Sequence, residues 1–151
     1  VETRWKAWQD TELRAALGFT DARYGDFTLA ALQNMNGARV VGTPRWTFTL
    51  GADQSWEIGE GLLTAGVQTR FSDGYPVSLN EALPGGNFND RQSRFHKTDL
   101  RLSYAPDSER WSAGLWVRNL ENDAQLTQSM PFGRVQITDP RTWGVNLSYK
   151  F

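Results

Sequence analysis

Apolar and polar residues alternate along most of the chain. In residues 143–151, WGVNLSYKF, the apolar residues Trp143, Val145 and Leu147 alternate with Gly144 and Asn146. A period of two is typical of a β-strand with one apolar and one polar face, because successive side chains point to opposite sides of the strand. Seven stretches show this pattern: about 1–9, 11–20, 45–58, 62–71, 95–104, 111–120 and 143–151. The pattern predicts an all-β fold.

The connections between these strands alternate in length. Short turns are predicted at 9–12, 59–61 and 106–109. Long polar connections, rich in Gly, Pro, Asn and Asp, are predicted at about 33–45, 72–94 and 119–141. Strands joined by short turns run antiparallel. We therefore expect one antiparallel sheet with all its long connections at the same end.

Strand length and aromatic position favour a sheet that crosses a membrane. A soluble strand usually has about 5–6 residues, whereas a tilted strand needs about 9–11 residues to cross a bilayer. Two groups of aromatic residues are predicted near the two strand ends, as in the girdles of membrane barrels. The group near the long connections is Trp46, Phe71, Phe95 and Trp143, and the group near the short turns and the chain end is Trp56, Tyr104, Trp111, Tyr149 and Phe151. Together these features predict an antiparallel transmembrane β-barrel segment.

Composition narrows the function classes. The 151 residues suffice for one domain, and a net charge of -1 gives no basic excess for binding nucleic acid. Cysteine is absent, which excludes disulfides, thiolate metal sites and cysteine nucleophiles. The only histidine, His96, has no second histidine beside it and is predicted to be a surface or girdle residue. We therefore predict no enzyme activity, no cofactor and no metal site.

Four stretches carry a resemblance to a known family: LGFTDARYGDF (17–27), GTPRWTFTLGADQSW (42–56), LWVRNLEND (115–123) and DPRTWGVNLSYKF (139–151). In this order they resemble the last barrel strands of TonB-dependent outer-membrane receptors. Receptors of this family have a plugged barrel of about 22 strands, an N-terminal plug domain and a segment that engages TonB. The resemblance implies that residues 1–151 are a single partial domain, the last third of such a barrel. The plug is expected to lie outside these residues, and the start at Val1 rather than Met agrees with a fragment.

The resemblance also implies a function. Such receptors lie in the outer membrane of Gram-negative bacteria and import a scarce substrate, most often a ferric siderophore, when TonB remodels the plug. Other members import vitamins, haem, metals or glycans. This portion would supply barrel wall and extracellular loops in contact with outer-membrane lipid. Its last strand is similar to the signal that the barrel assembly machinery recognises, with matching residues at Trp143, Val145, Leu147, Tyr149 and Phe151.

Arginines lie in or beside the long connections, at Arg39, Arg45, Arg91, Arg94 and Arg134. If the imported substrate is an anionic chelate, Arg39, Arg91, Arg94 and Arg134 are candidate contacts, because guanidinium groups pair well with carboxylate and similar oxygens. The alternative is that the loop arginines balance loop acids or bind lipopolysaccharide phosphates.

Two other interpretations stay open from the sequence. One is a soluble ligand-binding module, either a β-sandwich or a lipocalin-like barrel, with an apolar interior. The other is a small complete outer-membrane barrel, which should have an even number of strands. It would need an eighth strand, and the connection 72–94 is the one place that could hold it.

Overall fold

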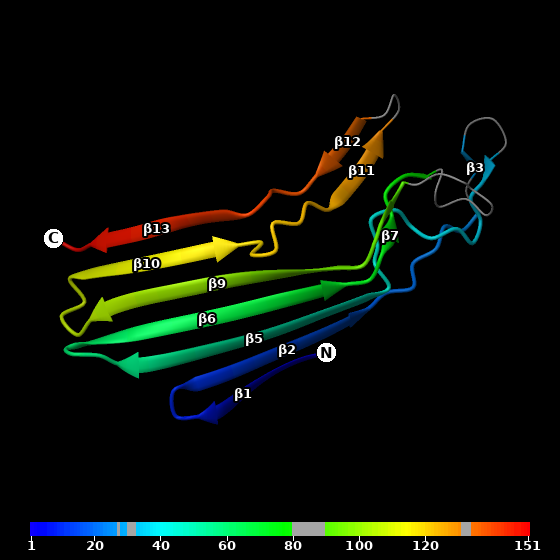
Figure 1. Ribbon diagram of the computed structural model, residues 1–151. Coiled ribbons are helices and arrows are strands. Elements are labelled where there is room, and N and C mark those ends of the chain that lie inside the picture. The colour runs from blue at the N-terminus through cyan, green and yellow to red at the C-terminus, as the bar shows by residue number, and fades with distance from the viewer. Residues whose placement is uncertain (27, 30–32, 80–89, 131–133) are drawn as a thin grey trace.

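A computed structural model of the chain describes all residues except 27, 30–32, 80–89 and 131–133. Its main feature is a seven-stranded antiparallel sheet in which each strand pairs with the next along the sheet (Figure 1). The strands are, in order, β1 (Glu2–Trp8), β2 (Thr11–Phe19), β5 (Trp46–Glu57), β6 (Gly61–Ser72), β9 (Phe95–Pro106), β10 (Trp111–Arg118) and β13 (Thr142–Tyr149). Each predicted strand is confirmed, with bounds that agree to within two residues.

Short turns join β1 to β2, β5 to β6 and β9 to β10, all at one end of the sheet, which we call the turn end (Figure 1). Two of these turns contain a residue with left-handed backbone, Gly59 with φ 62° and Glu109 with φ 50°. Glycine adopts this conformation without a steric penalty. The turns keep the strands antiparallel, as predicted.

The long connections lie at the opposite end, the loop end (Figure 1). They are not simple loops, because each contains a small antiparallel hairpin. The hairpins are β3 (Thr28–Leu29) with β4 (Gln33–Asn34), β7 (Tyr75–Pro76) with β8 (Arg91–Gln92), and β11 (Leu126–Met130) with β12 (Arg134–Ile137). The sequence did not predict them, since strands of two to five residues are too short to show a clear alternating pattern.

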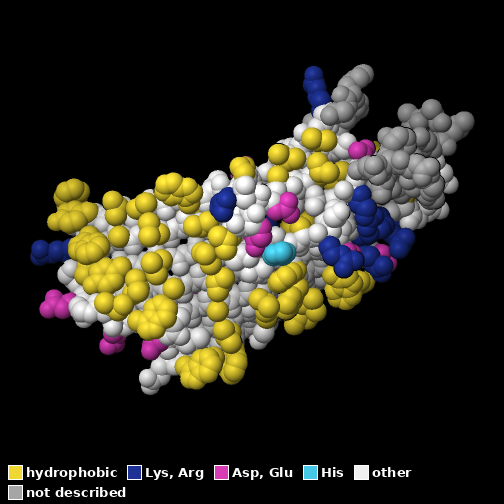
Figure 2. All heavy atoms as spheres, viewed as in Figure 1, with side chains coloured by type: hydrophobic (Ala, Val, Ile, Leu, Met, Phe, Trp, Pro, Cys, Tyr) yellow, Lys and Arg dark blue, Asp and Glu magenta, His cyan; other side chains and the backbone are white. Residues whose placement is uncertain are grey.

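The pairing register places most of the apolar residues of the seven strands on one face. Directly paired residues project from the same face of a sheet, so each row of partners runs across the sheet on one side. One row is Leu13, Ala52, Val67, Leu100, Val117 and Trp143. We call this side the apolar face and the other side the polar face. Figure 2 shows hydrophobic side chains gathered over the sheet on the side that faces the viewer.

Among the described residues, no second layer packs against either face of the sheet. Leu50, Leu115 and Leu147 on the apolar face are 44%, 53% and 79% exposed. The buried hydrophobic residues among those described are Met35, Ala38 and Val77, which all lie in the long connections. The described part of the chain has no helix of the length and apolar character needed to cross a membrane. Packing in this chain is therefore concentrated at the loop end.

The sheet does not close on itself. Strands β1 and β13 are its two edges, and each pairs with one neighbour in the described chain. The described residues thus lack the closed barrel or two-layer sandwich that the soluble interpretation requires. The described part of 72–94 contributes only β7 and β8, which pair with each other. No eighth strand joins the sheet within the described residues, which disagrees with the small-barrel interpretation.

Candidate functional site

Aromatic rings line the loop end of the apolar face. The ring centroids of Phe19 and Trp46 are 4.5 Å apart, and those of Phe48 and Phe71 are 6.2 Å apart. His96 continues this row, because its ring stacks on Phe71 at 5.7 Å. The prediction of a girdle position for His96 agrees with this contact.

A second group of rings lies at the turn end. Tyr104 and Trp111 are 5.6 Å apart, and Tyr149 and Phe151 are 5.4 Å apart. The two bands lie near opposite ends of the strands on one face. Trp and Tyr, whose rings have an apolar body and a polar tip, form similar bands at the two interfaces of membrane proteins.

Phe95 does not belong to the predicted girdle. It pairs with Ser72, whereas His96 pairs with Phe71. The side chain of Phe95 therefore projects from the polar face. The prediction for Phe95 is wrong because it was based only on the position of Phe95 near the strand end. Successive residues of a strand point to opposite faces, so the neighbouring His96 lies on the apolar face instead.

Charged residues on the polar face form a three-strand ion-pair network. The Asp53 carboxylate on β5 lies 2.5 Å from Arg14 Nη2 on β2 and 2.7 Å from Arg101 Nη2 on β9. Between β5 and β9 lies β6, and Gly66 is the β6 residue that pairs with both Asp53 and Arg101. A Cβ at Gly66 would overlap Asp53 Oδ1 and lie 2.5 Å from Arg101 Nε. Gly66 thus leaves the space through which this pair bridges two strands that are not neighbours.

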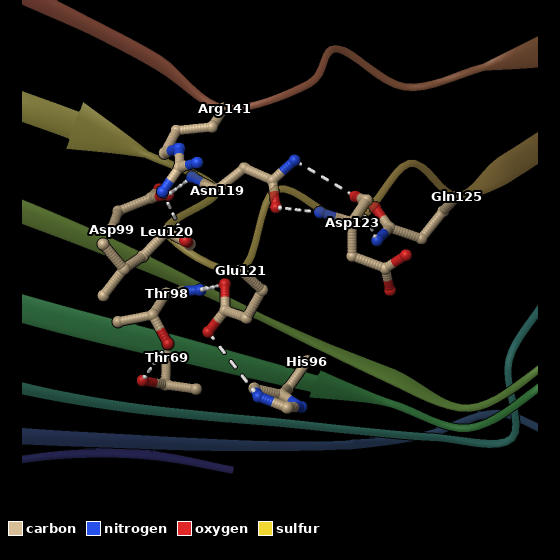
Figure 3. Close-up of polar contacts among 10 residues, drawn as sticks. All are labelled: Thr69, His96, Thr98, Asp99, Asn119, Leu120, Glu121, Asp123, Gln125 and Arg141. Atoms are coloured by element: carbon tan, nitrogen blue, oxygen red, sulfur yellow. Dashed lines mark hydrogen bonds and ion pairs between the residues drawn. The ribbon is translucent and has the colours of Figure 1, made fainter.

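The motif 119–123 ties three strands together at the loop end. Asn119 is 4% exposed and has φ 56°. Its side-chain amide donates to the carbonyl oxygens of Asp123 and Asp139, each at 3.1 Å, and accepts from the N–H of Asp123 at 3.1 Å. Figure 3 shows the two contacts with Asp123. Its backbone N–H donates to Asp99 Oδ1 at 3.0 Å. One asparagine therefore links β9, the end of β10 and the segment before β13.

Glu121 completes this motif. Its Oε2 accepts from the Thr98 N–H at 2.8 Å, and its Oε1 lies 3.6 Å from His96 Nε2 (Figure 3). Burial raises the pKa of Glu121, but the hydrogen bonds from Thr98 and the nearby His96 outweigh it and hold that pKa below its usual value. The ionised carboxylate is thus the form that the turn requires.

The long connections also contact one another. The N–H of Gly42 donates to the Pro76 carbonyl at 2.9 Å, which joins the first connection to the second. The hydroxyl of Tyr75 donates to the Leu126 carbonyl at 3.2 Å, which joins the second to the third. Burial raises the pKa of Tyr75, and Arg70 acts in the opposite direction. The phenol is therefore kept neutral and able to donate.

Four arginines gather in the first two connections, and we call Arg23, Arg39, Arg45 and Arg91 the arginine cluster. Burial lowers the pKa of Arg39, and the positive charges of Arg91, Arg45 and Arg23 lower it further, while Asp73 opposes them. Arg39 Nη2 donates to the Thr43 carbonyl at 3.3 Å. Arg23 has its own partner, Asp21, at 3.3 Å. Of the predicted substrate contacts, Arg39 and Arg91 are thus brought together.

The other two predicted contacts lie elsewhere. Arg94 lines a hollow of about 420 Å³ with Trp46, Phe71 and His96, beside the aromatic band. Arg134 begins β12 in the third connection, and its described contacts do not connect it to the arginine cluster.

Asp53, Gly66 and Asn119 were not predicted to have structural or binding roles. The register of the strands would have predicted the ion pairs of Asp53, since Asp53 falls on the same face as Arg14 and Arg101.

The predicted assembly residues lie in one row. Trp143, Val145, Leu147 and Tyr149 occupy alternate positions of β13 on the apolar face, opposite Val117, Leu115, Ala113 and Trp111 of β10. Phe151 follows the strand, and its ring meets that of Tyr149 edge to face at 5.4 Å.

Two solved structures share this fold. The ferric preacinetobactin receptor BauA from Acinetobacter baumannii matches with a TM-score of 0.71 at 17% identity, over 98% of this chain and 21% of that one. The ferric yersiniabactin uptake receptor FyuA from Yersinia pestis matches with a TM-score of 0.78 at 18% identity, over 99% of this chain and 22% of that one. The chain thus spans about a fifth of each receptor. A comparison with curated proteins finds no match.

The family assignment comes from the sequence. Residues 1–120 match the family model described as TonB dependent receptor-like, beta-barrel. The match covers most of the chain and includes six of the seven sheet strands, β1 to β10 in sheet order. The antiparallel sheet, with one apolar face and its long connections at one end, agrees with this assignment. The chain belongs to the TonB-dependent receptor β-barrel family.

Proposed function

We propose that this chain is the C-terminal part of the barrel of an outer-membrane receptor that imports a ferric siderophore in a TonB-dependent step. The observation that carries the proposal is the family match over residues 1–120. The substrate class is supported by the two structural neighbours, which are receptors for ferric preacinetobactin and ferric yersiniabactin. Both are transport receptors, and the proposal includes no covalent chemistry.

In this proposal the apolar face meets the lipid of a Gram-negative outer membrane and the polar face lines the lumen. The loop end is extracellular, and the hairpins there form part of the substrate entrance. TonB acts through parts of the receptor outside these residues, including the plug. The row Trp143, Val145, Leu147, Tyr149 and Phe151 is the proposed signal for the barrel assembly machinery, supported by its unbroken alternation on β13.

Uptake by the full receptor tests this function. In a strain that lacks its other iron receptors, cells with the full receptor should take up radiolabelled iron from at least one ferric siderophore of a panel. The same cells without TonB should take up none. Uptake of vitamin, haem or glycan substrates but of no ferric siderophore would contradict the substrate class, and uptake without TonB would contradict the mechanism.

We further propose that Arg39, Arg91, Arg94 and Arg134 contact an anionic ferric chelate. For Arg39 and Arg91 the proposal is supported by the positive charges that surround Arg39, whereas for Arg94 and Arg134 it rests on their place in the long connections. Arg39→Gln and Arg91→Gln should each raise the half-saturating substrate concentration about fivefold, since a charge-assisted hydrogen bond contributes roughly 1 kcal/mol or more. Arg110→Gln, an exposed arginine at the turn end, is the matched control. Equal uptake by all three variants would exclude a substrate role for the cluster.

A further inference from the structure

One residue of the third connection is held at both of its backbone groups by the second connection. The N–H of Leu126 donates to Gln92 Oε1 at 2.6 Å, and the carbonyl of Leu126 accepts from the Tyr75 hydroxyl at 3.2 Å. Tyr75 and Gln92 are direct partners across β7 and β8, so their side chains project from the same face of this hairpin. We call Tyr75 and Gln92 the clamp.

The clamp is a buried contact. Gln92 is 9% exposed, and a buried polar group that loses its partner costs free energy. The N–H of Ser129 continues the contact, because it donates to the Val77 carbonyl at 3.0 Å. The clamp and this bond therefore fix the β7–β8 hairpin against β11.

The same hairpin also contacts the first connection. The N–H of Gly42 donates to the Pro76 carbonyl at 2.9 Å, and Pro76 is the strand partner of Arg91. The guanidinium of Arg39 donates to the carbonyl of Thr43 at 3.3 Å, one residue after Gly42. Arg39 and Arg91 thus belong to two segments that meet at Pro76.

The orientation of Arg91 follows from that of Gln92. Successive side chains of a strand point to opposite faces, so Arg91 projects from the face of the hairpin opposite to the clamp. Arg91 is exposed, whereas Gln92 is buried. Holding Gln92 in place therefore also determines where the guanidinium of Arg91 lies.

Arg39 and Arg91 repel each other. Burial lowers the pKa of Arg39 most, and the charge of Arg91 lowers it more than that of Arg45 or Arg23. The ion pairs of the described residues do not include Arg91. Two like charges move apart unless the chain holds them, and an anion placed between them removes the repulsion. A site that is already held in this arrangement binds an anion more tightly, because binding then does not have to order it.

We propose that Tyr75 and Gln92 are positioning residues of the anion site: through Leu126 they keep Arg91 beside Arg39 in the free receptor. The ligand is an anionic ferric chelate, so the inference rests on the proposed function. Neither clamp residue has to contact the chelate. The third connection would thus set the affinity of a site in the first two connections.

The distance between the first and second connections tests the clamp without any ligand. Spin labels are attached at Asn36→Cys and Ser93→Cys, two exposed positions, in an otherwise cysteine-free full receptor. Double electron–electron resonance should give one narrow distance distribution for the native clamp. In Tyr75→Phe/Gln92→Leu the distribution should become longer and broader, because the two arginines are no longer held together.

Tyr104→Phe/Gln54→Leu is the matched control. It removes the same groups at the turn end, where the Tyr104 hydroxyl donates to the Ile58 carbonyl at 3.3 Å and Gln54 Nε2 donates to the Ser55 carbonyl at 2.9 Å. The label distance should stay native in this control. Melting curves check that every variant is folded, and Tyr75→Phe alone, which removes a single oxygen atom, is measured in the same way if the double variant is not.

Affinity for a ferric siderophore that the receptor imports is the second measurement. The clamp variant should raise the half-saturating concentration about tenfold, because only a fraction of the free receptor then holds the binding arrangement. Its maximal uptake rate should stay native, and saturating chelate should restore the native label distance. A variant that only weakened the fold would lower the melting temperature and leave the affinity unchanged.

The inference is overturned if the folded clamp variant keeps the native label distance, if it keeps the native half-saturating concentration, or if only its maximal rate falls. A receptor that binds no ferric chelate would refute the proposed function instead. The label distance of the free receptor then decides the role of the clamp alone, where a widened distribution supports it and a native one refutes it.

Discussion

Gly66 shows how one residue shapes the polar face. Its missing side chain lets Asp53 reach Arg101 across β6. We predict that Gly66→Ala lowers the free energy of unfolding by about 1 kcal/mol, because the added methyl group displaces a partly exposed ion pair. Gly114→Ala is the matched control, since a Cβ on Gly114 of the same face would meet its nearest atom at an ordinary 3.6 Å. Thermal unfolding of the full receptor in detergent measures both, and an equal effect of the two changes would contradict this role for Gly66.

Glu121 makes the turn after β10 sensitive to acid. The hydrogen bonds from Thr98 hold the pKa of Glu121 below its usual value. The stabilisation is therefore present above the unfolded-state pKa of about 4.3 and is lost as pH falls through the lower folded-state value. We predict that Glu121→Gln lowers the melting temperature more at pH 6 than at pH 3, because protonation of the native carboxylate removes the difference as the pH falls. A difference between native and variant receptor that stays constant over this pH range would exclude the carboxylate as the cause.

At the level of the element, the sequence predicts the sheet well and the connections poorly. Alternation over nine or more residues identified all seven strands and their apolar face, because the two-residue period is a direct consequence of strand geometry. The hairpins β3–β4 and β7–β8 have two-residue strands, which leave no period to detect. The pair Asp53–Arg101 joins residues 48 positions apart, so it depends on the register of three strands. Phe95 was misplaced because chain position was used where strand parity decides.

Substitutions in strand β13 can test which face of the sheet contacts lipid and which faces the lumen. Val145 lies mid-strand on the apolar face, and Asn146 is its neighbour on the polar face. We predict that Val145→Lys costs about 2–4 kcal/mol of folding free energy in lipid vesicles, as for a lysine on the lipid side of a barrel near the bilayer midplane. Asn146→Lys, which adds the same charge facing the lumen, should cost much less. Denaturant titration of the full receptor in vesicles measures both values, and a larger cost for Asn146→Lys would reverse the assignment of the faces.

The described residues form an open sheet, and its shape determines how the chain behaves alone. Within that part of the chain, the edges β1 and β13 each leave one row of backbone groups without a strand partner, and such edges pair with other chains. The apolar face is exposed, while the buried hydrophobic residues Met35, Ala38 and Val77 lie in the connections and give the described sheet no core. We predict that residues 1–151 alone aggregate in detergent-free buffer, whereas the full receptor in detergent is monodisperse.

Light scattering after size-exclusion chromatography distinguishes the two states. A monomer of 17.1 kDa with cooperative unfolding in water would mean that the chain covers its own apolar face, and the soluble ligand-binding interpretation would return. Aggregation in water that is reversed only by adding the rest of the barrel would instead show that the missing strands supply the partners of both edges. That outcome would tie the stability of this portion to closure of the barrel, since backbone groups in a bilayer core must all be paired within the protein.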